Sequence, residues 1–269
     1  MNTKDPPLEN LKLIINLLNQ KNFNQSLALS TELLAEFPKS ILLFNIIGAS
    51  NSGLYQFDDA IKSYQNAIQI NPNYAEAYYN MGIAYRNLDS YKLAIDCYSK
   101  ALEINPKYAN ANYNLGNALK SIGDLKGAIQ NYKKAIKNKP DFIDAHNNLG
   151  NALMDIGEHE SAIEIYFKAI RINQNYTDTF KNIAKALKLM SFTEPNSNLQ
   201  EIISFIISQK NIIKPVDLSR AAISLIKVDP SLNEILKLNL NDELNQSVEN
   251  IVSALSKNTL LLKLMSISL

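Results

Sequence analysis

The sequence predicts an all-α fold built from repeated pairs of helices. The first observation behind this prediction is a period of 34 residues, which emerges when the stretch Ala75 to Tyr108 is compared with the chain on both sides of it. Five columns coincide at this period, and in that stretch they are Gly82, Ala94, Tyr98, Ala101 and Pro106. The second observation is helical spacing, because one side of a helix that turns by about 100° per residue would carry Tyr78, Met81, Gly82 and Tyr85.

These columns of small, aromatic, small and proline residues resemble the tetratricopeptide repeat (TPR), a helix-turn-helix unit that stacks into a right-handed α-solenoid. The resemblance covers residues 7 to about 190 and implies about five and a half repeats. They span residues 7–40, 41–74, 75–108, 109–142, 143–176 and, as a half repeat, 177–190. The first repeat is degenerate, since its Gly, Ala and aromatic columns hold Ile14, Ser26 and Ser30. In the fifth repeat Gln174 replaces Pro, so the turn after it is less firmly specified.

The segments that flank the array are expected to differ from it. Residues 1–6 are predicted to form a disordered tail. Residues 191–269 are expected to form a helical C-terminal region without the repeat, and helical periodicity places its helices at 199–209, 216–228, 231–240 and 243–258. The chain then ends in the apolar sequence LLLKLMSISL, which indicates a truncated chain or an end that packs on something else.

Each column of the repeat has a physical reason. Gly on the first helix and Ala on the second allow the two helices to approach closely, and the aromatic residue is expected to fill the space between successive repeats. Pro ends the second helix, because it lacks an amide donor. Gly123 and Gly157 fall at the turns inside the fourth and fifth repeats, where we expect a left-handed backbone conformation.

The resemblance also indicates where a ligand would bind. In the TPR family the first helices line a concave groove, and in the third repeat the side of the first helix that would face it carries Glu76, Tyr79, Asn80, Ile83 and Asn87. One column of this groove is asparagine in four successive repeats, at Asn80, Asn114, Asn148 and Asn182. An amide side chain offers an acceptor and two donors, so a row of them can hold an extended peptide backbone.

This column resembles the asparagine ladder in the TPR superhelix of O-linked N-acetylglucosamine transferase, which grips extended peptides. Lys12 and Ile46 interrupt it in the first two repeats. Tyr79 and Tyr113 are expected to act as stacking platforms beside it, and further candidates for the peptide-binding surface are Asn117, Asn147, Asn151, Lys181 and Lys185.

The groove residues allow two alternative interpretations. The asparagine column could only solvate a helix face or support local packing, since the chain is generally rich in asparagine. A carboxylate clamp of the TPR family would need Lys and Asn, then Asn, then Lys and Arg across three consecutive repeats. Lys181 and Lys185 share the last repeat instead, so this second mode is not favoured.

Composition excludes several other classes of function. The net charge of +1 argues against nucleic-acid and membrane partners. The lone Cys97 suits a reducing compartment and is expected to be a buried, inert thiol, and with no signal peptide or membrane span evident, a cytoplasmic location is the default. No catalytic or metal-binding residues are predicted, because His146 and His159 lack partners at ligand spacing. No cofactor is predicted either, because the sequence shows no glycine-rich phosphate-binding loop.

The sequence therefore predicts a non-enzymatic scaffold whose groove binds an extended segment of another protein. One alternative is the substrate-recognition arm of a larger transferase, of the methyltransferase or glycosyltransferase kind, which continues beyond Leu269. Another is a structural module that assembles with copies of itself through its apolar C-terminal segment.

Overall fold

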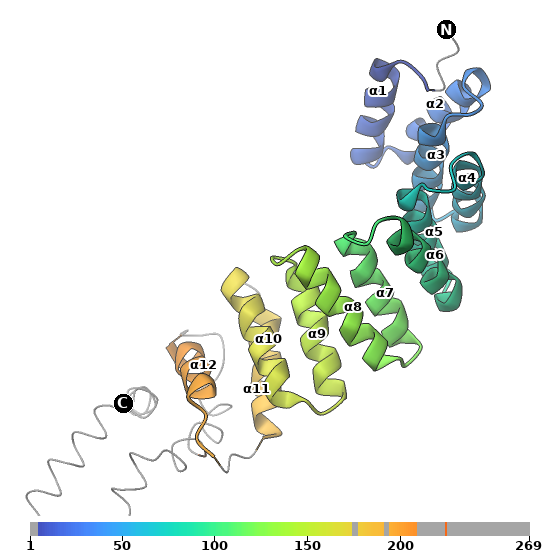
Figure 1. Ribbon diagram of the computed structural model, residues 1–269. Helices are drawn as coiled ribbons and strands as arrows, with labels where there is room; N and C mark the ends of the chain where they lie inside the picture. The colour runs from blue at the N-terminus through green and yellow to red at the C-terminus, as the bar shows by residue number, and fades with distance from the viewer. Residues whose placement is uncertain (1–4, 174–176, 191–193, 209–223, 225–269) are drawn as a thin grey trace, which may run out of the picture. The chain divides into compact units, whose positions relative to one another are not determined.

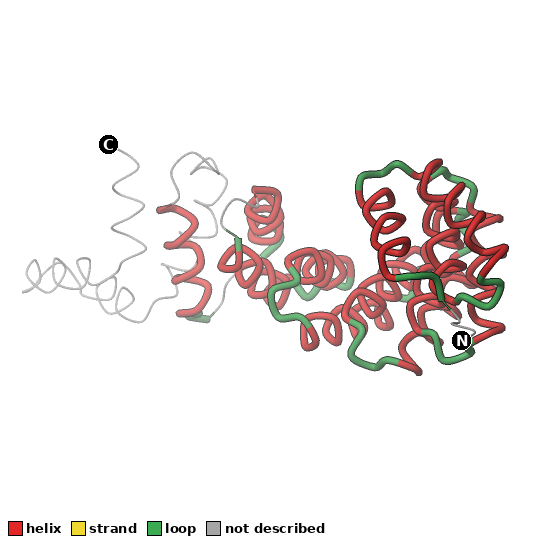
Figure 2. Tube along the Cα trace, turned by 90° about the horizontal axis from the view of Figure 1, so that it is seen from above, coloured by secondary structure: helices red, strands yellow, loops and turns green. Residues whose placement is uncertain are grey.

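The computed structural model describes residues 5–173, 177–190, 194–208 and 224 (Figure 1). All regular structure in these ranges is α-helical, and the helices are joined by short loops (Figure 2). They are α1 (Leu8–Asn19), α2 (Phe23–Glu36), α3 (Ile41–Gly53), α4 (Phe57–Ile70), α5 (Ala75–Asn87), α6 (Tyr91–Ile104), α7 (Ala109–Ser121), α8 (Leu125–Asn138), α9 (Ile143–Asp155), α10 (His159–Ile172), α11 (Thr177–Lys188) and α12 (Ser197–Ser208).

The helix starts follow the period seen in the sequence. First helices begin at residues 41, 75, 109, 143 and 177, and second helices begin at residues 57, 91, 125 and 159. The predicted all-α repeat architecture is confirmed by this register. The chain divides into two compact lobes, an N-terminal lobe up to Ala145 and a C-terminal lobe from His146.

Within the N-terminal lobe the first helices form the inner face of the array. Helix α1 contacts α3, α3 contacts α5 and α5 contacts α7, whereas the second helices of this lobe contact each other less. Neighbouring repeats are therefore closer on the side of the first helices. We call the surface formed by α3, α5 and α7 on this side the inner face.

The tyrosine column packs on the glycine column of its own repeat. A Cβ atom added to Gly48, Gly82 or Gly116 would lie 2.5, 2.6 or 2.6 Å from the ring of the tyrosine sixteen positions later, which is too close for any real side chain. The same rings also reach the next repeat, since Tyr98 packs in one cluster with Leu115 and Ala118. The aromatic column thus fills the space between repeats, as the sequence predicted, and it also fixes the distance between the two helices of its own repeat.

Two residues at the start of the array contact the first repeats, and several expected segments lie outside the described residues. Pro6 is buried and Asp5 accepts a hydrogen bond of 2.5 Å from the Ser40 hydroxyl, so these two residues of the predicted tail are held against the array. Several predicted features lie outside the described residues: residues 1–4, Gln174, the apolar end of the chain and, apart from Ser224, the three helices expected between 216 and 258.

Helix α12 closely matches the helix expected at residues 199–209, and it packs on α10. Its apolar side is fully buried, with Leu199, Ile202 and Ile203 at most 1% exposed. The Asn198 amide donates a hydrogen bond of 2.7 Å to Glu164 of α10, and the ring centroids of Phe167 and Phe205 lie 5.3 Å apart. Helix α12, which follows the half repeat, therefore covers part of α10.

The turn inside each repeat requires a left-handed residue. Gly123 and Gly157 have φ angles of +85° and +82°, which confirms the conformation expected for them. The equivalent positions of the first three repeats hold Lys21, Tyr55 and Asp89, and these residues also have positive φ angles, of 61°, 62° and 53°. Because a side chain disfavours this region, the first three turns are strained relative to the last two.

We expect Lys21→Gly to raise the free energy of unfolding by about 1 kcal/mol, because it relieves a left-handed conformation at an exposed residue. Gly123→Ala is the matched opposite change and should lower the free energy of unfolding by about 1 kcal/mol. Urea denaturation followed by circular dichroism measures both. Equal stability of Lys21→Gly and the parent protein would show that the turn in the first repeat is unstrained.

Candidate functional site

The predicted site residues of the N-terminal lobe lie together on the inner face. Tyr79 and Asn80 come from α5, and Tyr113, Asn114 and Asn117 come from α7. All are half-buried except Asn114, which is 7% exposed. Each of these residues lies on a first helix, and their role in binding a ligand stays a prediction.

The asparagine column forms hydrogen bonds between successive repeats. Asn80 Nδ2 donates to Asn45 Oδ1 at 3.1 Å, and Asn114 Nδ2 donates to the Tyr79 hydroxyl oxygen at 3.1 Å. In both cases the acceptor lies 35 residues earlier, on the first helix of the preceding repeat. One N–H group of each amide thus joins neighbouring first helices, so the asparagine column does support local packing.

Asn45 is a participant that the sequence analysis missed. Its side chain is 8% exposed, accepts the bond from Asn80, and donates a bond of 3.1 Å to Glu76 Oε1. The other carboxylate oxygen of Glu76 accepts a bond of 3.4 Å from the Tyr74 hydroxyl. Asn45 occupies the same column as Tyr79, and following that column upstream would have identified it even though Ile46 interrupts the asparagine column there.

The two predicted stacking platforms already stack on rings of the array. The ring centroid of Tyr79 lies 4.8 Å from that of Tyr108 and 6.0 Å from that of Tyr98. Tyr113 is placed in the same way, 4.8 Å from Phe142. Burial raises the pKa of the Tyr79 hydroxyl, so this group is a neutral donor at physiological pH.

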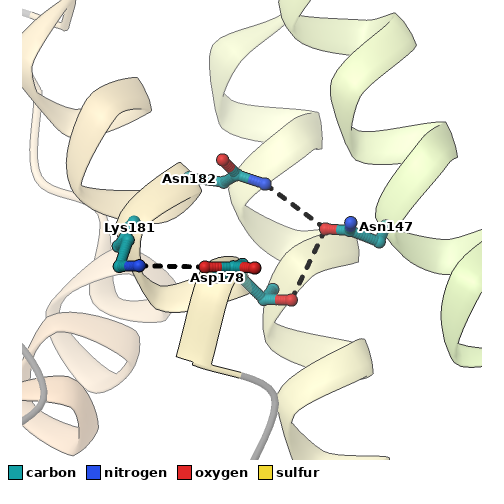
Figure 3. Close-up of polar contacts among 5 residues, drawn as sticks. Asn147, Asp178, Lys181 and Asn182 are labelled. Carbon is teal, nitrogen blue, oxygen red and sulfur yellow. Dashed lines mark hydrogen bonds and ion pairs between the residues drawn. The ribbon is translucent and has the colours of Figure 1, made fainter.

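The C-terminal lobe repeats the amide contact (Figure 3). Asn182 Nδ2 donates to Asn147 Oδ1 at 3.3 Å and to Asn151 Oδ1 at 3.4 Å, and Thr179 Oγ1 donates to Asn147 Oδ1 at 3.4 Å. Lys181 forms an exposed ion pair of 2.9 Å with Asp178. Lys185 is exposed on α11, and Asn148 is half-buried on α9.

Two further candidates, Asn117 and Asn151, bind the hydroxyls of the buried tyrosine column. Tyr132 donates to Asn117 Oδ1 at 2.8 Å, and Tyr166 donates to Asn151 Oδ1 at 2.7 Å. In the third repeat the position of these asparagines holds Ile83. Within the described residues the buried Tyr98 hydroxyl accordingly has no hydrogen-bond partner.

Other chemistry is limited in the part of the chain that the structure describes. Cys97 is 6% exposed, and burial, with Asp96 nearby, raises the pKa of its thiol to about 12, in keeping with the inert thiol expected. His146, which shares the column of Tyr78, is buried. In residues 5–173, 177–190 and 194–208, no three His, Cys, Asp or Glu side chains form a group that could hold a metal ion, and no helix could span a membrane.

We expect Tyr132→Phe to lower the free energy of unfolding by about 1 kcal/mol, because it leaves the Asn117 carbonyl oxygen without its donor. Tyr98→Phe should leave stability unchanged or raise it by up to about 1 kcal/mol, because it removes a buried hydroxyl that has no partner. Chemical denaturation of the two variants in parallel measures the difference. Equal losses in both would contradict the assignment of an unpaired hydroxyl to the third repeat.

The sequence of the central repeats matches models of a known repeat family. Residues 56–89 and 116–157 match a family model described as TPR repeat. Residues 75–108 and 143–176 match a model described as Tetratricopeptide repeat, and residues 97–130 match another of the same description. Together these matches cover residues 56–176.

Individual proteins show the same similarity. The peroxisomal targeting signal receptor of Candida glabrata is 29% identical over 94 residues, which make up 34% of this chain and only 15% of the receptor. The crystal structure of MamA is 28% identical, with a TM-score of 0.56 over 61% of this chain and 95% of that chain.

The structure of YrrB, described as a TPR protein with an unusual peptide-binding site, is 18% identical, with a TM-score of 0.54 over 75% of this chain and 92% of that chain. At this level of identity YrrB supports the fold alone. The solenoid architecture expected from the sequence is thereby confirmed, and residues 56–176 are built of tetratricopeptide repeats.

Proposed function

We propose that this protein is an interaction scaffold, not an enzyme, and that the inner face of its N-terminal lobe binds an extended segment of another protein. TPR arrays present extended surfaces of this kind, and the relative from Candida glabrata is named as a receptor for a targeting signal. The C-terminal lobe offers a second set of candidate contacts of the same chemistry, at Asn147, Asn148, Asn151, Asn182, Lys181 and Lys185.

The proposal rests mainly on one observation: two polar groups of the third repeat keep hydrogen-bonding capacity that the array does not use. Asn80 uses an N–H group to reach Asn45, and within the described residues its Oδ1 atom accepts no hydrogen bond. The Tyr79 hydroxyl accepts from Asn114, which occupies its oxygen and leaves its O–H group as a donor. Both side chains are half-buried, so they combine partial desolvation with access from solvent.

This pair matches the needs of a peptide. A peptide unit brings one N–H donor and one carbonyl acceptor, which complement the Asn80 carbonyl oxygen and the Tyr79 hydroxyl. Tyr113 repeats the ring position of Tyr79 one repeat later, beside Asn114 and Asn117. The asparagine column would therefore act in two ways: it joins neighbouring repeats, and with its remaining atoms it contacts the ligand.

The test is a selection of random peptides on the immobilised full chain, followed by calorimetry with the strongest binder. Asn80→Ala and Tyr79→Phe should each weaken binding by about 1 kcal/mol, because each removes one hydrogen bond to the peptide backbone. Asn66→Ala is the matched control, since Asn66 is exposed on the second helix α4 and away from the inner face. Thermal melting of each variant checks that the array is still folded.

Unchanged affinity in both Asn80→Ala and Tyr79→Phe would show that the peptide does not contact the inner face of the third repeat. Failure of the parent protein to select any peptide would overturn the proposed function itself.

A further inference from the structure

The third repeat carries a positive charge that the rest of the N-terminal lobe does not neutralise. Arg86 is half-buried in the last turn of α5, and within the described residues it forms no hydrogen bond or ion pair. It lies seven positions after Tyr79 and three after Ile83, so all three side chains share one side of the helix. The next acidic residue in the sequence is Asp89, and its carboxylate accepts a hydrogen bond of 2.8 Å from the Tyr91 hydroxyl.

Repeat symmetry places Arg86 beside the unpaired hydroxyl of Tyr98. In the second repeat the position of Arg86 is held by Ser52, whose hydroxyl lies 3.5 Å from that of Tyr64, the equivalent of Tyr98. The third repeat keeps the tyrosine and replaces the serine by arginine. Ile83 packs against the same cluster as Tyr98 and offers no acceptor, unlike the asparagines at its position in the next two repeats.

The electrostatics of the two tyrosines agree with this placement. Burial raises the pKa of the Tyr79 and Tyr98 hydroxyls, and the positive charge of Arg86 acts in the opposite direction on both. Glu76 does not cancel this charge, since it lies ten residues earlier on α5, about 15 Å along the helix axis. That separation exceeds the screening length of about 8 Å at physiological ionic strength.

Arg86, Tyr79 and Tyr98 together offer several hydrogen-bond donors that lack an acceptor. The guanidinium group has five N–H donors, the Tyr79 oxygen is already occupied by Asn114, and the Tyr98 O–H group has no acceptor among the described residues. A carboxylate is the complement of such a set, because it only accepts and it carries the opposite charge.

We propose that Arg86 and the Tyr79 hydroxyl bind a carboxylate of the ligand, with the unpaired O–H group of Tyr98 adding a favourable dipole nearby. The inference rests on the proposed function and specifies it, since the bound segment is then an acidic peptide. The site belongs to a single repeat and differs from a clamp of basic residues spread over three repeats. Lys120 holds the same position as Arg86 in the fourth repeat.

The experiment compares the full chain with its Arg86→Gln variant in parallel selections from one random peptide library. The parent protein should enrich peptides with Asp or Glu, and the variant should lose that enrichment. In calorimetry with the strongest synthetic peptide, replacing its acidic residue by the amide and introducing Arg86→Gln should each weaken binding about tenfold. The two changes together should cost little more than either alone, because they remove the same contact.

Control measurements separate charge, fold and the source of the carboxylate. Arg171→Gln removes the same type of residue from the last turn of the second helix α10 and should leave affinity unchanged. Melting temperatures show whether Arg86→Gln is still folded. A peptide with an amidated C-terminus distinguishes a side-chain carboxylate, for which affinity persists, from a terminal one, for which affinity falls about tenfold.

The outcomes bear differently on the two proposals. If the parent and Arg86→Gln enrich the same peptides without acidic residues, the carboxylate site is overturned while peptide binding stands. If the two changes in calorimetry are additive, the acidic residue contacts another part of the protein and the assignment to Arg86 is wrong. If the parent enriches no peptide, both proposals fall together.

Discussion

In each of the second to fifth repeats a tyrosine ring from the second helix lies against a glycine of the first. The contact leaves no room for a Cβ atom, so it sets how closely the two helices approach and in which register. The same ring reaches into the next repeat, as Tyr98 does with Leu115, and so carries the geometry of one repeat into the following one. The position of every inner-face side chain depends on this packing, because the face exists only where successive first helices are held side by side.

The polar side chains of the inner face serve the array and the surface at once. The amides of Asn80 and Asn114 each use an N–H group to bind the preceding repeat, and the carbonyl oxygen of Asn117 holds the hydroxyl of the buried Tyr132. An amide has more hydrogen-bonding positions than any one of these contacts uses. The remaining atoms have their orientation fixed by packing, which would reduce the entropy lost on binding the proposed peptide.

The third repeat differs from its neighbours at two positions, and these differences change its polar groups. Ile83 stands where the next two repeats place an asparagine, so the Tyr98 hydroxyl has no acceptor within the described residues. Arg86 stands where the second repeat places a serine that lies beside the equivalent tyrosine hydroxyl. A repeat protein can acquire a specific site in this way, by changing two positions in one repeat while the packing columns stay the same.

The sequence alone determined the helix pairs, their 34-residue register and the left-handed turns at Gly123 and Gly157, because these follow from local geometry and from columns that recur. It also identified the inner-face residues, since helical spacing decides which side chains share a side. Only the tertiary structure showed that Asn80 and Asn114 bond to residues 35 positions earlier, that Asn45 takes part, and that α12 packs on α10. These contacts join segments distant in sequence, and the atoms of an amide that remain for a ligand are known only once its neighbours are in place.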